Sequence, residues 1–190
     1  MPPIEKKEIK PIDNRKMIFM FLAILVIASL IYVFFFKKET EITFLNNDCF
    51  TEKQRTIDGS SMSPLFKDNE VVTTFENYYA CNEIKKGDVV IFNFKTREGD
   101  YIKKVLGMPN DLLEIEDGYI KINGEFVLNS EGIKYSLNKI EESILIKPLQ
   151  SNQIPRNGYL VLGDNVSEDT FDSRKFGYIS KDQIIGKVKK

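Results

Sequence analysis

The feature that most constrains this chain is an uninterrupted apolar run, MIFMFLAILVIASLIYVFFF, over residues 17–36. A helix that crosses a bilayer needs about 20 predominantly apolar residues, and this run contains no charge. A cleaved secretory signal has a shorter apolar core followed by small residues, whereas this run ends in phenylalanines followed by Lys37 and Lys38. The sequence therefore predicts a transmembrane anchor at 17–36 that is not removed.

The basic residues around this run predict its direction in the membrane. The residues before the run include Lys6, Lys7, Lys10, Arg15 and Lys16, and those directly after it include Lys37 and Lys38. Because the more basic flank stays in the cytoplasm, we expect a cytoplasmic leader at 1–16, a single pass at 17–36, and an extracytoplasmic domain at 41–190. The expected location is a plasma or inner membrane. A domain of that length can bury a core of its own.

Histidine is absent from all 190 residues, and the net charge is −1. The missing histidine excludes a Ser–His–Asp triad, a Cys–His pair and a His-ligated zinc site. A nucleophile in this chain needs another base, and lysine is the usual substitute. The near-zero net charge gives no sign of a nucleic-acid partner.

The two cysteines, Cys49 and Cys81, both follow the apolar run. They can form a disulfide in an oxidising compartment or remain as free thiols, and the sequence leaves both readings open. Two distant cysteines without histidine make a poor metal site, so we expect neither a metal nor a cofactor.

The rest of the chain has the pattern of a mostly antiparallel β domain. Short runs rich in β-branched and aromatic residues predict strands at 71–75, 89–92, 101–106, 119–122 and 159–162. Asn123-Gly124 predicts a hairpin turn between 119–122 and 125–128. Residues 128–155 are more polar and weakly patterned, which predicts a small inserted β lobe over roughly 112–155. No long segment outside the apolar run has helical periodicity.

Three segments contain the chemically informative residues. The first, DGSSMSP at 58–64, offers exposed serine hydroxyls in a turn, although turns of this composition are mostly plain loops. The second, YIKKVLGMPND at 101–111, carries Lys103 and Lys104, which face opposite ways in a strand. An inward lysine loses solvation and its pKa falls, so its neutral amine can accept a proton. Without a partner serine, both lysines would simply be surface charges.

The third segment, GDNVSEDTFDSRKFG at 163–177, is dense in loop-forming residues. It is acidic like a calcium loop but lacks the ligand spacing of an EF-hand. Asp172 and Arg174 are spaced to form an ion pair, and this structural role is the one we predict for them.

Taken in order, these segments resemble the type I signal peptidase family. The shared features are an N-terminal anchor, Gly-x-Ser-Met-x-Pro at 59–64, Lys-Gly-Asp-Val-Val-x-Phe at 86–92, Tyr-Ile-Lys-Lys-Val-x-Gly-x-Pro-x-Asp at 101–111, and Gly-Asp-Asn followed by Asp-Ser-Arg. The resemblance covers the chain from about Ile57 to the C-terminus. The single-anchor layout resembles the Gram-positive and related forms, and the mitochondrial inner-membrane relatives are the alternative match.

The resemblance implies a Ser–Lys catalytic pair. Ser61, directly before Met62, matches the nucleophile, and Lys103, the first lysine after Tyr-Ile, matches the general base. Thr170 matches a hydroxyl residue that hydrogen-bonds the catalytic lysine, with Ser167 as the fallback position.

The resemblance also implies supporting residues. Asp164, Asp172 and Arg174 match residues that organise the site. Gly59 and Ser60 flank the oxyanion hole, which is expected to use backbone N–H groups, chiefly that of Ser61. The expected substrate groove includes Ile57, Met62, Tyr101 and Ile102.

Three positions depart from the family pattern. Leu65 stands where a small threonine is usual, and position 59 is glycine where some members carry a serine that completes the oxyanion hole. The loop between Gly-Asp-Asn and Asp-Ser-Arg is one residue longer than usual, which bears on the assignment of Thr170.

The function implied by the resemblance is removal of N-terminal signal peptides from exported preproteins by a membrane-bound serine endopeptidase. The implied partners are secretory preproteins with small residues one and three places before the cut, together with the lipid bilayer. A self-cleaving repressor-type protease uses similar chemistry but carries no anchor. The alternative from another class is a catalytically silent, membrane-tethered binding module with the same fold.

Overall fold

The structure is a computed structural model that describes residues 23–27, 29, 49–167 and 170–189. It divides into two units, Met1–Asn47 and Asp48–Lys190. In the first unit, residues 23–27 and 29 are helical. The predicted leader and most of the predicted anchor lie outside the described residues. Within the described residues, no helix is both long enough and apolar enough to cross a membrane.

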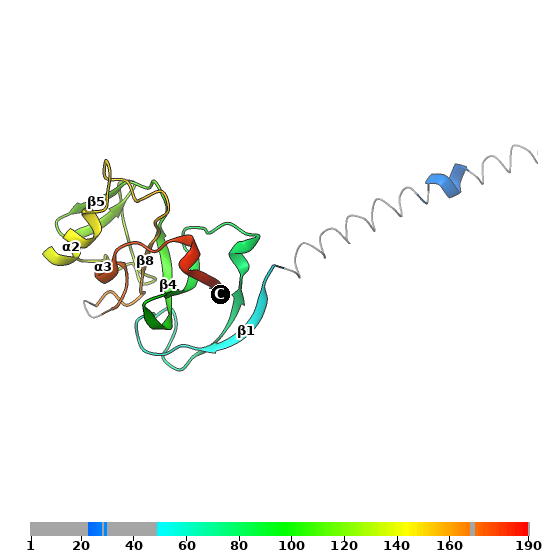
Figure 1. Cartoon of the computed structure of the whole chain (residues 1–190), viewed down its shortest axis with the longest axis horizontal. Coiled ribbons are helices and arrows are strands. Elements are labelled where there is room, and N and C mark those ends of the chain that lie inside the picture. The colour runs from blue at the N-terminus through cyan, green and yellow to red at the C-terminus, as the bar shows by residue number, and fades with distance from the viewer. Residues whose placement is uncertain (1–22, 28, 30–48, 168–169, 190) are drawn as a thin grey trace, which may run out of the picture. The chain divides into compact units, whose positions relative to one another are not determined.

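The second unit is built on a six-stranded antiparallel sheet with the strand order β1-β2-β9-β3-β4-β8 (Figure 1). Its strands are β1 (Thr51–Thr56), β2 (Val71–Glu76), β3 (Val89–Phe94), β4 (Arg97–Gly107), β8 (Leu160–Leu162) and β9 (Ile184–Val188). The predicted strands at 71–75, 89–92, 101–106 and 159–162 all fall in this sheet, with small differences at their ends. The expected mostly antiparallel β fold is confirmed.

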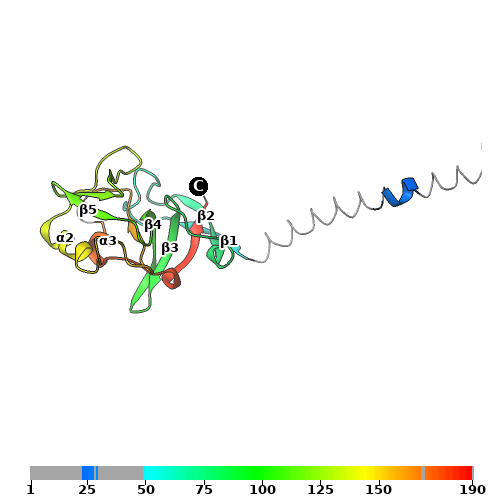
Figure 2. The same cartoon turned by 90° about the horizontal axis from the view of Figure 1, so that it is seen from above.

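A second, three-stranded antiparallel sheet has the order β5-β6-β7. Its strands are β5 (Leu113–Glu116), β6 (Tyr119–Ile122) and β7 (Glu125–Phe126). The predicted Asn123-Gly124 turn joins β6 to β7, and both of its residues have positive φ. This sheet falls inside the segment 112–155 for which the sequence predicts an inserted lobe. In Figure 2, β5 lies at one end of the domain and β1 and β2 lie at the other.

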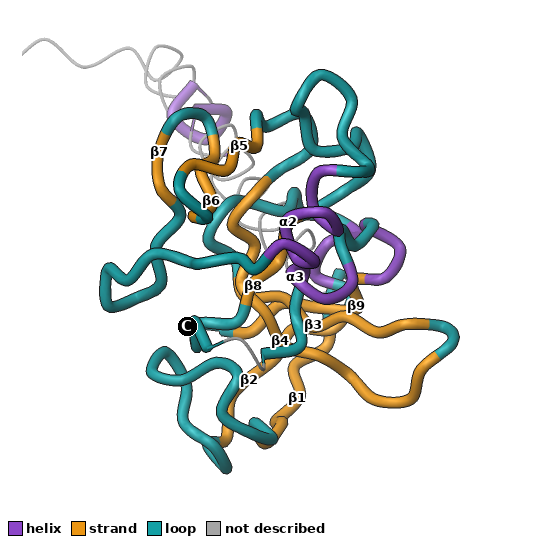
Figure 3. The backbone as a smooth tube through the Cα atoms, turned by 90° about the vertical axis from the view of Figure 1, so that its left-hand side faces the viewer, coloured by secondary structure: helices purple, strands orange, loops and turns teal. Residues whose placement is uncertain are grey.

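The described helices are short. Those of the second unit are α2 (Lys139–Ile146), α3 (Ser173–Phe176) and the 3₁₀ turns η1 (Tyr78–Ala80) and η2 (Lys181–Gln183). The sequence analysis did not predict α2, although Asn138 and Glu141 form a capping box at its N-terminus. Figure 3 shows α2 beside α3, and a salt bridge of 2.9 Å joins Glu141 of α2 to Lys175 of α3.

Cys49 and Cys81 are joined by a disulfide with a Cα–Cα distance of 5.8 Å. Of the two readings that the sequence left open, the structure has the paired one. The bond ties the chain just before β1 to the residue that follows η1.

The buried apolar side chains form separate clusters beneath the two sheets. One cluster lies under the Ser61 turn and contains Ile57, Met62, Phe66, Val72, Val89, Ile91 and Val188. Another joins the small sheet to β8 and includes Tyr135, Leu145 and Leu160. The first cluster fixes the serine turn against the sheet, because Met62 is only 1% exposed.

Two strand edges in the large sheet lack a strand partner among the described residues. β1 is the terminal strand of the sheet and pairs only with β2. β4 pairs with β8 only from Lys104 onward, so residues 97–103 of β4 pair with β3 alone. Two side-chain contacts join the segment 55–61 to residues 100–103 of β4: Arg55 to Asp100 and Ser61 to Lys103.

Candidate active site

The serine segment forms a tight turn between β1 and β2. Gly59 has a φ of +84°, a conformation that favours glycine, and its N–H donates to the Asp68 carboxylate at 2.8 Å. The Ser63 N–H donates to the Ser60 carbonyl at 3.0 Å. Ser61 is half-buried between exposed Ser60 and buried Met62. The turn therefore presents the Ser61 hydroxyl at the surface of a buried apolar cluster.

Lys103 lies on β4 opposite Val90 of β3. Its side chain is only 3% exposed, whereas its neighbour Lys104 is half-exposed. The expectation that the two lysines face opposite environments is confirmed. The Lys103 Nζ lies 2.8 Å from the Ser61 Oγ and donates to the Ile102 carbonyl, also at 2.8 Å.

Burial lowers the pKa of Lys103 from 10.5 to about 8. The main cause is loss of solvation of the charged amine. The carboxylate of Asp172 raises this pKa and the guanidinium of Arg174 lowers it, so their charges act in opposite directions. An amine with this pKa is neutral in about a tenth of the molecules at pH 7 and in more at higher pH, and a neutral amine can accept a proton from a neighbouring hydroxyl.

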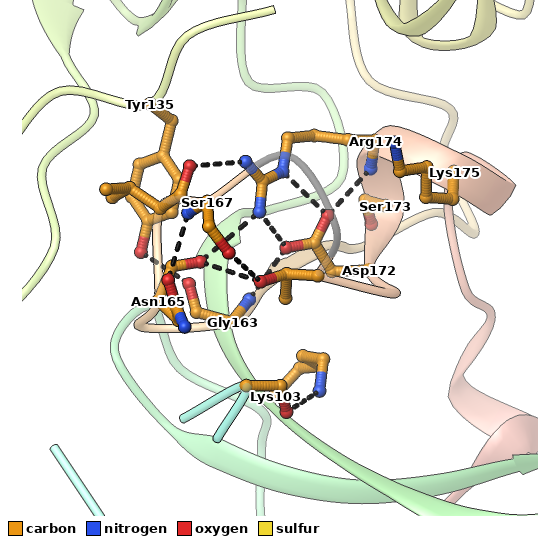
Figure 4. Close-up of polar contacts among 12 residues, drawn as sticks. Lys103, Tyr135, Gly163, Asn165, Ser167, Asp172, Ser173, Arg174 and Lys175 are labelled. Atoms are coloured by element: carbon orange, nitrogen blue, oxygen red, sulfur yellow. Dashed lines mark hydrogen bonds and ion pairs between the residues drawn. The ribbon is translucent and has the colours of Figure 1, made fainter. Parts of the chain in front are cut away.

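Asp172 and Arg174 form the predicted ion pair, and both side chains are 0% exposed. Asp172 caps α3, and its Oδ1 accepts hydrogen bonds of 3.0 Å from the backbone N and the Nε of Arg174. Its Oδ2 accepts from a guanidinium nitrogen of Arg174 at 2.8 Å and from the Gly163 N–H at 3.0 Å. Figure 4 shows the Arg174 side chain above Asp172, with Lys103 below them.

Gly163 connects the Asp172–Arg174 ion pair to the serine turn. A Cβ at position 163 would lie 2.4 Å from the Ser61 carbonyl oxygen and 2.5 Å from a methyl carbon of Thr170. The Asn165 N–H donates to the Ser61 carbonyl at 3.1 Å, and its side-chain amide donates to the Ser60 carbonyl at 3.3 Å. Because Gly163 follows β8, which pairs with β4 next to Lys103, the sheet positions the serine and lysine segments together.

Thr170 is buried beside Gly163, and its hydroxyl donates to the Asn165 carbonyl at 3.0 Å. Its oxygen lies 3.4 Å from the Ser167 hydroxyl. Within the described residues, the hydrogen bonds of the Lys103 amine go to Ser61 and Ile102, not to either of these hydroxyls. A direct role of Thr170 or Ser167 toward the lysine stays a prediction.

Asp164 is 0% exposed and faces the segment that follows the small sheet. Its Oδ1 accepts from the Ser130 N–H at 3.0 Å, and its Oδ2 accepts a very short hydrogen bond from the Ser130 hydroxyl. The Asn129 side chain donates to the Asp164 carbonyl at 3.1 Å, and the buried Tyr135 hydroxyl donates to the Gly163 carbonyl at 2.8 Å.

Sequence reasoning missed Ser130, Tyr135 and Asn165 as supporting residues. No local pattern marks Ser130 or Tyr135, since each contacts the 163–164 segment from about thirty positions away. Asn165 belongs to a Gly-Asp-Asn motif that the sequence analysis singled out, which was the available signal for it.

The four predicted groove residues divide into two pairs. Ile57 and Met62 are 3% and 1% exposed and pack in the apolar cluster under the serine turn. Tyr101 and Ile102 are half-buried on β4. Their backbone belongs to the part of β4 that pairs with β3 alone among the described strands. The role of these four residues in binding a substrate stays a prediction.

A cavity of about 650 Å³ lies away from this site and is lined by residues that include Asn77, Tyr159 and Lys181. The Ser61–Lys103 contact lies instead next to the part of β4 that pairs with β3 alone among the described strands. Among the described residues, no group of three or more Cys, Asp or Glu side chains is arranged to hold a metal ion.

Comparison with known proteins identifies the family. The model of the family described as signal peptidase, peptidase S26, matches residues 14–190. Signal peptidase IB of Staphylococcus aureus is 38% identical over 143 residues, which cover 70% of this chain and 73% of that protein. Signal peptidase I T of Bacillus subtilis (strain 168) is 33% identical over 138 residues, which cover 70% of this chain and 69% of that protein.

A solved structure is also similar. The crystal structure of a signal peptidase I from Enterococcus faecalis V583 aligns with a TM-score of 0.44 and 24% identity, covering 57% of this chain and 98% of that one. From the family match and the relatives, the chain belongs to the signal peptidase family, peptidase S26. The resemblance to type I signal peptidases is confirmed, and the chain is a serine endopeptidase of that class.

Proposed function

We propose that this chain is a membrane-bound endopeptidase that removes N-terminal signal peptides from exported preproteins, with Ser61 as nucleophile and Lys103 as general base. The observation that carries the proposal is the 2.8 Å contact between the Ser61 Oγ and an amine that is only 3% exposed. The names of the relatives, signal peptidase IB and signal peptidase I T, support the substrate class.

The chemistry is acyl transfer in two steps. Neutral Lys103 takes the Ser61 proton as the Oγ attacks the scissile carbonyl carbon, and the resulting ammonium returns that proton to the leaving amine as the C–N bond breaks. Lys103 then removes a proton from water, whose oxygen attacks the carbonyl of the ester formed with Ser61, and the ammonium returns that proton to the Ser61 Oγ as the ester C–O bond breaks. No net proton or electron is gained or lost over the cycle.

The oxyanion hole in this proposal uses the backbone N–H of Ser61, with Ser60 beside it. Preorganised donors aimed at the developing oxyanion commonly contribute about 10²–10³ in rate. The contacts of Asn165 to the carbonyls of Ser60 and Ser61 hold this backbone in place from one side. Gly59 supplies the turn conformation, and Asp164, Asp172 and Arg174 hold the Gly163–Asn165 segment that packs against it.

The substrate binds as an extended strand in the slot between the serine segment and β4. Free strand edges bind peptides through main-chain hydrogen bonds. The small side chains one and three places before the cut then lie on one face of the bound strand, and β4 supplies Tyr101 and Ile102 at neighbouring levels of the slot. The anchor at 17–36, with the leader 1–16 in the cytoplasm, holds the domain 41–190 on the outer side, where translocated preproteins emerge.

The second candidate is a silent membrane-tethered binding module with the same fold. Leu65 and the lengthened loop before Asp172 favour it, whereas the Ser61–Lys103 contact favours an active enzyme. A silent module would bind a preprotein and leave its length unchanged.

Cleavage of a preprotein tests the proposal. The full chain in detergent or lipid is incubated with a preprotein that carries an Ala-x-Ala site, and the new N-terminus is read by mass spectrometry. We expect one cut directly after the second alanine, and loss of cutting when either alanine is replaced by a bulky residue. Binding without a new N-terminus at alkaline pH would support the silent module instead.

A further inference from the structure

The two segments that carry Ser61 and Lys103 contact each other at a second point. Arg55 is the penultimate residue of β1, and Asp100 lies on β4 three residues before Lys103. Their side chains form an ion pair of 2.7 Å between the Arg55 guanidinium and the Asp100 carboxylate. The segment 55–61 is therefore joined to β4 at two levels, by the Arg55–Asp100 ion pair and by the Ser61–Lys103 contact.

The bridge belongs to a small charged group at the end of the slot. The second guanidinium nitrogen of Arg55 binds Glu76 of β2 at 2.6 Å, and Glu76 also binds Lys53 of β1. The side chains of Arg55, Glu76 and Asp100 are 28%, 20% and 33% exposed, so water reaches them only in part. With two cations and two carboxylates, the group is neutral overall.

One donor in this group is unsatisfied. The Nε of Arg55 is buried and has no hydrogen-bond partner among the described residues. Buried donors are usually paired, and a peptide strand laid in the slot would bring carbonyl or carboxylate oxygens to this level. The partly exposed charges point to contact with a ligand, and the buried Arg55 Nε is an unpaired donor beside them.

We propose that the Arg55–Asp100 ion pair is a specificity determinant that reads the charge of the substrate residue four places before the cut. The inference rests on the proposed function. A strand advances about 3.3 Å per residue, so Asp100 lies about 10 Å before Lys103 along β4. For a peptide that runs parallel to β4, with the residue before the cut level with Ser61 and Lys103, the residue at position −4 is level with Asp100.

Because the group of Lys53, Arg55, Glu76 and Asp100 is neutral overall, removing one of its charges should create a preference for a residue of that same charge at position −4. In the wild type, an uncharged side chain at −4 leaves the ion pair intact, whereas a charged one must compete with it. Asp100→Asn leaves Arg55 and Lys53 against Glu76 alone, a net positive group that favours an acidic residue at −4. Arg55→Gln leaves Lys53 against two carboxylates, a net negative group that favours a basic residue there.

The experiment uses the full chain in detergent and preprotein-derived peptides that carry Gln, Glu or Lys at −4 or −5. The readout is the ratio of kcat/KM for the Glu peptide to that for the Lys peptide. We expect this ratio to rise about 2- to 5-fold in Asp100→Asn and to fall by a similar factor in Arg55→Gln, as for partly exposed charge pairs. Since neighbouring side chains in a strand face opposite ways, the effect should appear at −4 and be weak at −5.

The matched control is Glu116→Gln, which removes a 2.9 Å ion pair with Lys121 on the small sheet. Its Glu-to-Lys ratio should equal that of the wild type. Loss of fold would lower cleavage of all peptides together and leave the ratio unchanged, and thermal unfolding of each variant measures it separately. Cleavage of the Gln peptide by the wild type reports the proposed function, whatever the ratios show. Ratios unchanged in both variants, or changed only by charges after the cut, would overturn the inference.

Discussion

The Lys103 amine lies 2.8 Å from the Ser61 hydroxyl oxygen, although the two residues are 42 positions apart. One comes from a turn held over an apolar cluster, and the other from a strand whose neighbour β8 leads directly into Gly163. The same packing that brings the lysine to the serine also removes it from water. Proximity and lowered pKa therefore have one structural cause.

The burial of Lys103 predicts that kcat/KM rises with pH. Because the pKa of Lys103 is lowered to about 8, the amine is protonated at acid pH and cannot act as a base. We expect kcat/KM for a signal-peptide substrate to rise about tenfold per pH unit below pH 8 and to level off above it. Stopped assays with a fluorogenic peptide from pH 5.5 to 10 measure the profile. A flat profile across that range would exclude a lysine base.

Much of this fold could be predicted from the sequence where one strand face is buried. Runs such as 89–92 and 119–122 are rich in β-branched and aromatic residues, and they form β3 and β6. β1 (TEKQRT) was missed because it is an edge strand with mostly exposed side chains, so it shows no apolar alternation. Helix α2 was missed because its apolar face is short, and its capping box at Asn138 and Glu141 was the signal to use.

The candidate site was predictable to a different extent. Ser61, Lys103 and the Asp172–Arg174 pair were found because their motifs are local in the sequence. Tyr135 and Ser130 contact Gly163 and Asp164 across the fold, and no local pattern encodes such a contact. The sequence also did not predict that the Thr170 hydroxyl bonds the Asn165 carbonyl, because this contact depends on the conformation of the loop that follows Gly163.

Asp172→Asn should destabilise the domain and lower activity. The substitution leaves the fully buried guanidinium of Arg174 without a charged partner and weakens the bond to the Gly163 N–H. Breaking a buried pair in this way costs about 3–5 kcal/mol, which urea unfolding would measure. The control is Glu142→Gln, which removes an ion pair with an exposed lysine on α2 and should leave the midpoint unchanged. Equal urea-unfolding midpoints for the two variants would contradict a stabilising role of the Asp172–Arg174 ion pair.

Gly163→Ala should reduce catalysis more than stability. The added methyl group would clash with the Ser61 carbonyl oxygen, so the serine turn or the Gly163 segment must shift, which disturbs the Ser61–Lys103 geometry. A displacement of this kind can lower kcat/KM by about 10²-fold. Gly107→Ala is the comparison, because its methyl group is also crowded, at 2.5 Å from Ile154, but away from the serine. A normal kcat/KM in Gly163→Ala, or an equal loss of kcat/KM in Gly107→Ala, would contradict this role of Gly163.

The disulfide should be measurable and stabilising. Thiol titration of unfolded, unreduced protein should find no free cysteine, because Cys49 and Cys81 are paired. Reduction should lower the free energy of unfolding by about 2–4 kcal/mol, as for a loop closed over 32 positions. Free thiols in the native protein, or an unfolding midpoint indifferent to reductant, would contradict the pairing.

The most direct test of the Ser61–Lys103 pair is preprotein cleavage by Lys103→Ala beside Lys104→Ala. The two lysines are neighbours on β4, but only Lys103 is buried against the serine. With folding of both variants verified by thermal unfolding, Lys103→Ala should lose at least about 10³-fold in kcat/KM, within the range that general-base catalysis contributes. Lys104→Ala should cleave at close to the wild-type rate. Cleavage by Lys103→Ala at more than a tenth of that rate would show that another group is the base.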